Sequence, residues 1–364
     1  RQGKGKKVIV IDEFHNIVKA SSDFMKELVA FMHSHWNREE VMIILCSSCI
    51  GWVENSMVTR IGEMAYELSG FLKIREVPFE DLIERFPNFR IEECVEAYAV
   101  LGGYPGLWNQ FDDRLTIQQN LCRNLLHPDC ALFEEGERLL TDQLRELGVY
   151  NTILASIADG SHKLNNLYLH TDFSRAKISV YLKNLIELEL VEKVFSYDTA
   201  GKDNVQKGIY RISHPLVDFY YTYMYPYRSE LEVLSVGEFY NRYVMPDFRR
   251  YVTRYFKQVC RQHLSRLNDR KRLPIQLEMI GEWVGKAGEL DIIAQDEMEH
   301  TLIGSCNWER PTTYEDYESL LSCAKKAKIN ADYVYMYSAF RFDERLNLET
   351  KVKSNLKLIQ VSDF

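Results

Sequence analysis

An apolar run that ends in two acids, K-V-I-V-I-D-E-F at residues 7–14, most strongly constrains how this chain can fold. Four consecutive β-branched residues with no polar alternation predict a parallel strand that is buried on both faces. A Ser-Ser-Asp cap and apolar residues at helical spacing predict a helix over residues 24–36. Residues 41–46, V-M-I-I-L-C, predict a second buried strand, so the first fifty residues are expected to form a βαβ unit.

The polar residues that follow the two strands predict a site at one edge of this sheet. Asp12 and Glu13 follow the first strand, and Ser47 and Ser48 follow the second. Ligands of parallel sheets bind beyond these carboxyl ends. Asp12 suits Mg²⁺, which prefers oxygen ligands, and Glu13 suits a base that orients or deprotonates an attacking water. Solvated acids that merely end a strand would give the same short pattern, so both interpretations stay open.

A phosphate-binding loop of the form G-x-x-x-x-G-K-[ST] does not occur in the 364 residues. The run R-Q-G-K-G-K-K at residues 1–7 has neither its spacing nor its Ser or Thr, and it precedes the acidic strand instead of opening a helix. It is predicted to be a basic surface loop. We expect this chain to be the downstream part of a protein whose upstream segment is missing.

Composition narrows the class of protein. A length of 364 residues predicts two to four domains, and no apolar run approaches the roughly 20 residues of a membrane span. The net charge of −8 argues against a protein coated in nucleic acid but allows a local basic patch. Eight scattered cysteines, with a single C-x-x-C pair, favour free thiols in a reducing cytoplasm over a zinc site.

Residues 149–228 have the pattern of a winged helix-turn-helix, with a candidate recognition helix over residues 174–188. Arg175 and Lys177 on that helix could meet phosphates or base edges. The segment holds nine Lys/Arg and eight Asp/Glu, however, so it lacks the strong excess of positive charge that is typical of nucleic-acid binding. DNA binding and use as a protein or intramolecular clamp both remain open.

A second basic segment lies at residues 249–272, which contain nine Lys/Arg and one Asp. Four of its cations fall at i, i+4, i+7 and i+11 and would form one stripe of a helix. They are Arg250, Arg254, Lys257 and Arg261. Such a concentrated stripe in an acidic chain favours a phosphate or acidic partner over a merely solvated face.

Several motifs in order resemble one protein family. They include I-D-E-F-H-N-I at residues 11–17, the Gly-Gly-x-Pro turn at 102–105, and E-L-D-I at 289–292. The chain resembles the prokaryotic, archaeal-type ATPases of the AAA-related P-loop class, which carry a winged-helix domain and a C-terminal PD-(D/E)xK nuclease-like domain. The resemblance implies ATP and Mg²⁺ as cofactors, Asp12 and Glu13 as the Walker B pair, and Ser48 near the position that senses the γ-phosphate.

The resemblance also implies an α/β multidomain fold. Its expected parts are the end of a P-loop ATPase sheet at residues 1–48, a helical lid at 49–148, the winged helix at 149–228 and a restriction-endonuclease-like domain at 229–364. The family sequence G-E-C-K-W is G-S-C-N-W here, so Ser305 and Asn307 replace a Glu and a Lys. A further family Glu aligns with Lys257. Asp291 is then a vestigial metal ligand beside Glu289, and the domain is expected to keep the fold without nuclease activity.

Three functions remain open. The leading one is a nucleotide-responsive, DNA-associated regulator or scaffold with an inactive nuclease-like domain. The second is an ATP hydrolase that works once an upstream P-loop is present. The third is a protein-interaction module that binds neither ATP nor DNA. The expected partners are DNA and a protein partner or a second copy of the chain, with no membrane.

Overall fold

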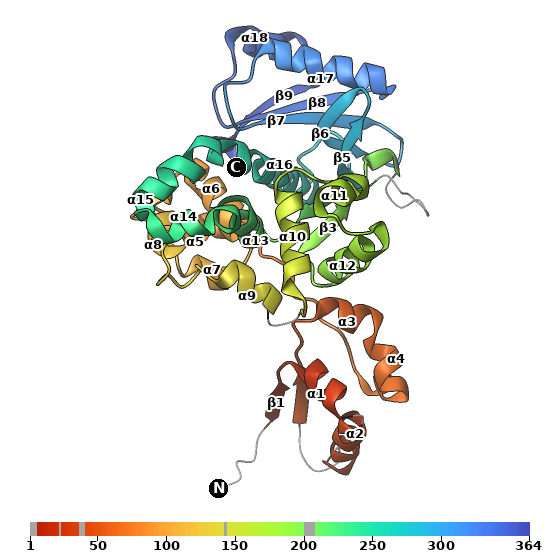
Figure 1. Cartoon of the computed structure of the whole chain (residues 1–364). Coiled ribbons are helices and arrows are strands. Elements are labelled where there is room, and N and C mark those ends of the chain that lie inside the picture. The colour runs from red at the N-terminus through yellow and green to blue at the C-terminus, as the bar shows by residue number, and fades with distance from the viewer. Residues whose placement is uncertain (1–5, 22, 36–40, 142–143, 200–207) are drawn as a thin grey trace. The chain divides into compact units, whose positions relative to one another are not determined.

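The computed structural model describes residues 6–21, 23–35, 41–141, 144–199 and 208–364. The chain divides into two compact units, Arg1–Arg75 with Phe173–Glu192, and Glu76–Asp172 with Lys193–Phe364. Both units contain helices and strands (Figure 1). The expected mixed α/β class is therefore confirmed.

The first unit is built on a parallel pair of strands. β1 (Lys7–Ile11) pairs with β2 (Val41–Leu45) along its whole length. α1 (Phe14–Ala20) and α2 (Phe24–His35) connect the strands, so the expected strand–helix–strand order is present with one additional short helix. A helical crossover returns the chain to the starting end of β1. The carboxyl ends of both strands consequently lie at the same edge.

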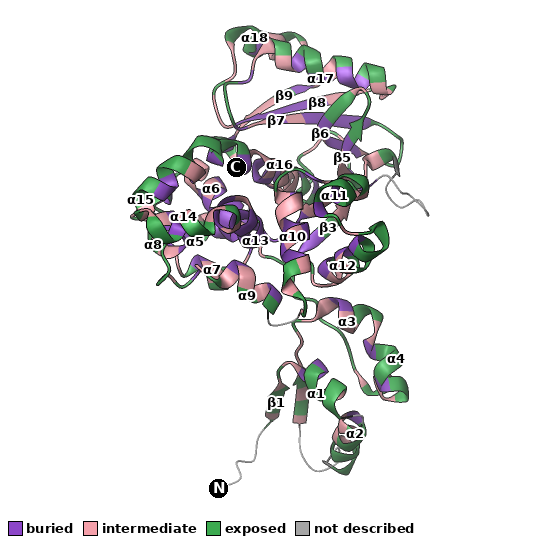
Figure 2. Ribbon diagram, in the orientation of Figure 1, coloured by how far each residue is buried: buried purple, intermediate pink, exposed green. Residues whose placement is uncertain are grey.

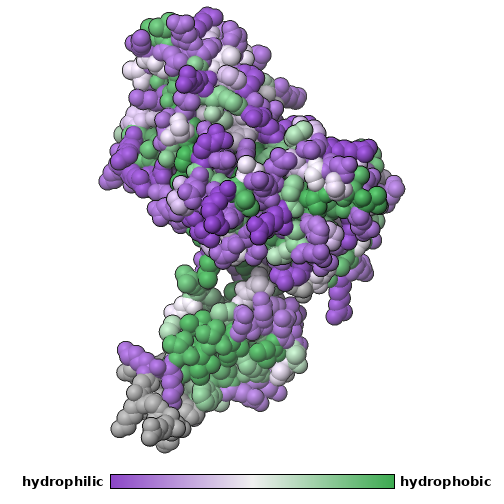
Figure 3. Space-filling view, turned by 90° about the vertical axis from the view of Figure 1, so that its left-hand side faces the viewer, coloured by the Kyte–Doolittle hydropathy of each residue, from purple (hydrophilic) through white to green (hydrophobic). Residues whose placement is uncertain are grey.

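The two strands are less buried than their sequences predict. Val8, Val10 and Met42 are 60%, 58% and 60% exposed to solvent, and Ile44 is also exposed. These four residues share one face because alternate residues of paired strands point the same way. The opposite face packs against a small apolar cluster, formed by Phe14, Met25, Met57 and Ile61. The expectation of strands buried on both faces is wrong for the described residues, and Figure 3 shows hydrophobic side chains gathered on this unit.

Helices complete the first unit. α3 (Ile50–Asn55), α4 (Met57–Ile61) and the 3-10 helix η1 (Gly62–Glu67) follow β2, and α12 (Arg175–Glu187) joins them from later in the sequence. Gly51 allows α3 to approach α12 closely. A Cβ at this position would lie 2.6 Å from the carbonyl oxygen of Glu187, so a larger residue would push the two helices apart.

The second unit begins with α5 (Phe79–Arg85) and α6 (Ile91–Leu101). Apolar spacing over residues 80–86 and 91–100 predicts these two helices. The Gly-Gly pair ends α6, because Gly102 has φ 58° and a Cβ on Gly103 would overlap the carbonyl oxygen of Val77. The helices that follow are α7 (Pro105–Trp108), α8 (Ile117–Asn124), α9 (Glu135–Thr141), α10 (Leu147–Ala158) and α11 (Leu164–Thr171).

Three helices and two strands occur in the order expected between residues 149 and 228. α10 and α11 precede α12, and β3 (Val191–Val194) and β4 (Ile209–Ile212) then form a two-stranded sheet. The short 3-10 helix η2 (Tyr197–Thr199) follows β3. The sequence predicts a turn over residues 199–204 between the two strands, and residues 200–204 of it lie outside the described residues.

Aromatic residues fill the helical region that comes next. Its elements are α13 (Pro215–Phe219), the π-helix η3 (Tyr220–Met224), the 3-10 helix η4 (Tyr225–Tyr227), α14 (Arg228–Val233), α15 (Val236–Phe239), the π-helix η5 (Tyr240–Val244) and α16 (Met245–Asp269). Every residue of α13 is buried (Figure 2). The buried Tyr221 hydroxyl donates to Asn151 Oδ1 at 2.6 Å, which satisfies its polar atom inside the core.

The C-terminal part of the second unit is a five-stranded mixed sheet in the order β5-β6-β7-β8-β9. The strands are β5 (Met279–Gly285), β6 (Gly288–Gln295), β7 (Thr301–Asn307), β8 (Tyr333–Ser338) and β9 (Leu356–Gln360). β5 with β6 and β6 with β7 pair antiparallel, whereas β7 with β8 and β8 with β9 pair parallel.

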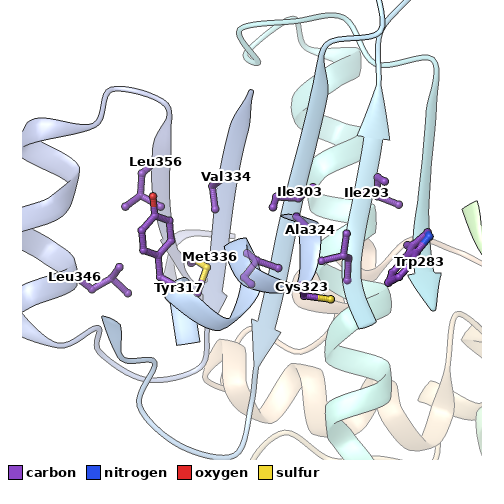
Figure 4. Close-up of a cluster of buried hydrophobic side chains, with 12 residues drawn as sticks. Trp283, Ile293, Ile303, Tyr317, Cys323, Ala324, Val334, Met336, Leu346 and Leu356 are labelled. Atoms are coloured by element: carbon purple, nitrogen blue, oxygen red, sulfur yellow. The ribbon is translucent and has the colours of Figure 1, made fainter. Parts of the chain in front are cut away.

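Helices cover both faces of this sheet. α17 (Tyr314–Ala327) and α18 (Glu344–Val352) lie on one face and α16 on the other, and the 3-10 helix η6 (Val361–Asp363) ends the chain (Figure 1). Figure 4 shows the apolar cluster of the domain, in which Tyr317 and Ala324 of α17 meet Ile303 and Met336 of the sheet. The sequence predicts a helix over residues 314–327 and a strand over residues 333–337, and α17 and β8 confirm both.

None of the helices in the described part of the chain has both the length and the apolar character that a membrane crossing requires. The eight cysteines all lie within the described residues and are free thiols.

Candidate functional site

A cluster of polar side chains occupies the carboxyl edge of β1 and β2. Asp12 and Glu13 follow β1 directly, and Ser47 and Ser48 follow β2. Backbone hydrogen bonds hold the two strand ends together, with Cys46 N–H donating to Ile11 O at 2.9 Å and Phe14 N–H donating to Cys46 O at 3.0 Å. The structure thus brings together the residues that the sequence predicted to share this edge.

Glu13 reaches across the edge from β1 to β2. Its Oε2 accepts the backbone N–H of Ser48 at 3.3 Å and lies 3.0 Å from Nδ1 of His15. The backbone of Glu13 is left-handed, with φ 49° and ψ 38°, a conformation that costs about 1–3 kcal/mol for a residue other than glycine. Such strain persists only where the surrounding contacts impose it, and here the contacts aim the carboxylate at the second strand.

His15 is the member of this cluster that sequence analysis did not single out. It is only 3% exposed, and its Nδ1 also lies 2.9 Å from Ser47 Oγ. Burial lowers the pKa of His15, the charge of Lys19 lowers it further, and Glu13 opposes both effects. The imidazole is therefore neutral at neutral pH. The signal in the sequence is a histidine two residues after the acidic pair, where the first turn of α1 returns it to the sheet edge.

Asp12 fits a magnesium ion that other groups help to hold. The residue is exposed, and its Oδ1 accepts the Glu13 N–H at 3.0 Å. In the described residues no three His, Cys, Asp or Glu side chains come close enough to bind a metal by themselves. Mg²⁺ in proteins commonly keeps several waters and takes one or two carboxylates plus substrate phosphates. The chemistry of Asp12 suits that mode of binding.

The basic run at residues 1–7, the nearest cations in sequence, falls mostly outside the described residues, which begin at Lys6. The two serines at the edge have different partners. Ser47 Oγ accepts the Cys49 N–H at 3.1 Å in addition to its contact with His15. It is thus Ser47 whose hydroxyl contacts His15, whereas Ser48 contributes its backbone N–H to Glu13.

A second candidate position lies between α16 and the C-terminal sheet. Lys257 Nζ of α16 is 2.6 Å from Asp291 Oδ1 on β6, and Asp291 Oδ2 accepts the Cys306 N–H at 2.8 Å. Burial alone would lower the pKa of Lys257, but the attraction of Asp291 outweighs it and the pKa is raised. The Lys257 ammonium group therefore pairs with the Asp291 carboxylate, which a metal ion would need as a ligand.

Ser305 and Asn307, at which the family resemblance implies a Glu and a Lys, have neutral side chains with local partners. Ser305 Oγ donates to Met336 Sδ at 3.3 Å. Asn307 Oδ1 accepts the backbone N–H groups of Glu309 and Arg310 at 3.2 and 3.3 Å, so it organises the turn after β7. Ser305 and Asn307 thus stabilise the local structure, and their side chains provide neither a second carboxylate nor a cation.

The cationic stripe on α16 is mostly turned toward internal partners. Arg254 Nη2 lies 2.8 Å from Asp218 Oδ2, and the Asp218 side chain is 5% exposed. The same Arg254 Nη2 also donates a hydrogen bond to Ile212 O at 2.8 Å. Arg261 Nη1 donates to Asp291 O at 3.0 Å. With Lys257 paired to Asp291, only Arg250 of the four presents a largely exposed side chain, at 79%. The apolar spacing of the helix predicts a buried side opposite the cations, and the structure buries its residues Val252, Phe256, Val259 and His263.

The candidate recognition helix α12 keeps its cations at the surface. Arg175 and Lys177 are exposed, and Ser174 caps the helix by accepting the Lys177 N–H at 3.2 Å. Lys177 Nζ lies 4.7 Å from the centre of the Phe173 ring and 5.8 Å from that of Tyr181. These two cations remain accessible to an anionic partner.

The segment after β3 contacts the C-terminal sheet, which sequence analysis did not predict. Ser196 Oγ accepts the Val284 N–H of β5 at 3.1 Å, and the Tyr197 ring lies over Gly281, where a Cβ would come within 3.1 Å of it. Arg211 of β4 pairs with Glu282 of β5 at 2.6 Å. Part of the predicted wing is thus used for an intramolecular contact.

Comparisons with known proteins place this chain near archaeal and bacterial proteins. Residues 220–323, from η3 into α17, match a family described as archaeal and bacterial proteins of unknown function. An uncharacterized protein of Methanocaldococcus jannaschii is 26% identical over 361 residues, which cover 98% of this chain and 80% of that relative. No solved structure matches the chain. Neither description names an activity, so any function must be argued from the residues of this chain.

Proposed function

We propose that this chain is part of a nucleotide-responsive, DNA-associated regulator or scaffold that holds magnesium–ATP at the carboxyl edge of β1 and β2. The observation that carries the proposal is the Glu13 carboxylate, held across this edge by the Ser48 N–H beside the exposed Asp12. Parallel sheets bind ligands at this edge. A strained glutamate fixed there is better suited to orienting a ligand than to ending a strand.

Each residue of the edge has a distinct proposed role. Asp12 binds the magnesium ion, directly or through water, and Mg²⁺ neutralises charge on the phosphates when it is bound. Glu13 accepts a hydrogen bond from the water that faces the terminal phosphate. Ser48, whose N–H donates to Glu13, is proposed to sense the terminal phosphate.

Residues 1–364 are proposed to bind nucleotide weakly and not to hydrolyse it. In P-loop proteins, backbone amides at a helix N-terminus and a lysine make most of the contacts with the β- and γ-phosphates. The phosphate-binding loop that supplies these groups does not occur in residues 1–364. We therefore expect a dissociation constant weaker than about 1 mM, equivalent to about −4 kcal/mol. Hydrolysis by the second candidate, an ATPase with an upstream P-loop, would use the same Asp12 and Glu13.

The test is a titration of the isotope-labelled chain with Mg-ATP, followed by NMR. Amide signals of residues 12–15 and of Ser48 should shift in a magnesium-dependent manner, and Asp12→Ala should abolish the shifts. Asp23→Ala is the matched control, since Asp23 is an exposed acid of the same unit and pairs with the nearby Lys26 at 3.4 Å. Shifts that persist in Asp12→Ala, or that map elsewhere, would contradict the proposed nucleotide site.

DNA association is proposed to involve α12. Arg175 and Lys177 are exposed there, whereas the side chains of Arg254, Lys257 and Arg261 on α16 are 32%, 27% and 25% exposed. Contacts with DNA phosphates need cations that the duplex can reach at the protein surface.

The third candidate, a protein-interaction module, is favoured by one observation. The segment after β3, which a DNA-binding winged helix would use as its wing, contacts β5 through Ser196 and Tyr197. Absence of both nucleotide shifts and DNA binding would leave this function as the one that the structure supports.

A further inference from the structure

His15 connects the two strand ends through a single ring nitrogen. Its Nδ1 lies 3.0 Å from Glu13 Oε2 and 2.9 Å from Ser47 Oγ, and the ring is buried against Trp52 with centroids 5.9 Å apart. The Glu13 side chain is 41% exposed, so without a second anchor its carboxylate would be free to sample several rotamers. Two donors on two different elements, the Ser48 N–H and His15, restrict it to one position.

The chemistry of the three groups assigns the ring proton. An ionised carboxylate only accepts hydrogen bonds, so the nitrogen that faces Glu13 must carry hydrogen. A neutral ring has one N–H, and it is therefore on Nδ1 and not on Nε2. Ser47 Oγ accepts from the Cys49 N–H and can share the Nδ1 proton with Glu13, which fixes the ring from the side of β2.

We propose that His15 is a positioning residue that holds the Glu13 carboxylate at the sheet edge through its Nδ1–H, with Ser47 fixing the imidazole. This inference rests on the proposed function, since Glu13 is the group that faces the nucleotide. His15 itself acts through Glu13 and does not need to touch the ligand. A role in packing alone would require only a ring of similar size, whereas positioning requires a donor at Nδ1.

The first test is the tautomer of His15, observed through the ring nitrogens of the isotope-labelled chain. His15→Asn identifies its signals among those of the nine histidines. The Nδ1–H form is expected in the unmodified protein, and Glu13→Ala is expected to remove this preference. An Nε2–H form in the unmodified protein would overturn the proposal, whatever the nucleotide does.

The second test separates positioning from packing by exchanging His15. Asn places an N–H donor near the position of Nδ1, while Leu fills the space without a donor. The Ser48 amide signal, which reports its hydrogen bond to Glu13, should move in His15→Leu as it does in Glu13→Ala and should return toward its original position in His15→Asn. Equal effects of Leu and Asn would overturn the proposal. His33→Asn is the control, because His33 pairs with Glu67 at 3.2 Å on the exposed surface of the same unit.

Mg-ATP added to the same samples tests the link to nucleotide. The His15 ring signals should shift in the unmodified protein and remain unchanged in Glu13→Ala. If amide signals at the edge respond to Mg-ATP but the His15 ring does not, the coupling is refuted while the nucleotide site stands. If no signal at the edge responds to Mg-ATP, the proposed function fails, and the tautomer still decides whether His15 holds Glu13.

Discussion

Arg254→Ala is expected to lower the free energy of unfolding of the protein. The sequence alone suggests a different role for Arg254, because it places the residue on a stripe of cations that favours a phosphate partner. The variant leaves Asp218, which is 5% exposed, without its cation. Removing one member of a buried ion pair costs about 3–5 kcal/mol. We expect the lower end, about 3 kcal/mol, because the Tyr255 hydroxyl still donates to Asp218 Oδ2 at 2.9 Å.

Urea denaturation followed by tryptophan fluorescence measures this loss. With a urea dependence of about 3 kcal/mol per molar, the unfolding midpoint of Arg254→Ala should fall by about 1 M. Arg250→Ala, on the same helix but with a 79% exposed side chain, should change the free energy of unfolding by less than about 0.5 kcal/mol.

A double variant tests the cause of the loss. Asp218→Asn in the Arg254→Met background removes the lone carboxylate and should recover at least about 1 kcal/mol of the stability lost in Arg254→Met alone. If Arg254→Ala is as stable as the unmodified protein and loses DNA affinity instead, then Arg254 faces a ligand and the internal ion pair does not account for it.

Three further outcomes are expected. Burial lowers the pKa of His214 from 6.5 to about 4. Between these pH values the unfolded chain binds a proton that the folded chain excludes. The free energy of unfolding should therefore fall by about 3 kcal/mol as the pH decreases from 6.5 to 4. His214→Phe should flatten this decline in urea titrations at several pH values, and an unchanged slope would contradict the assignment. Arg175→Ala/Lys177→Ala should weaken duplex-DNA binding and lower its salt dependence by about two units, because each cation neutralises one phosphate, while an unchanged slope would remove α12 from the interface. Plasmid DNA should stay uncut in Mg²⁺ and Mn²⁺ because Lys257 occupies the Asp291 carboxylate, and cleavage that Asp291→Ala abolishes would refute that interpretation.

The sequence alone determined those features that depend on local periodicity and on order along the chain. The strand–helix–strand start, the helices predicted over residues 80–86 and 91–100, and the break at Gly102 follow from apolar spacing and turn residues. The helix predicted over residues 314–327 and the strand over 333–337 do so as well. Asp12 and Glu13 could be placed beside Ser47 and Ser48, because parallel strands end at the same edge. These predictions needed no knowledge of which faces meet.

Only the tertiary structure decided which charges face solvent and which apolar faces are covered. Arg250 and Arg254 are one helical turn apart and look alike in sequence, yet one is exposed and the other pairs with Asp218 from α13. The apolar run of β1 predicted two buried faces, but burial depends on the elements that pack against a strand, and here helices cover one face only. The partnership of His15 with Glu13 and Ser47 likewise depends on a contact between residues 32 positions apart, which local pattern cannot specify.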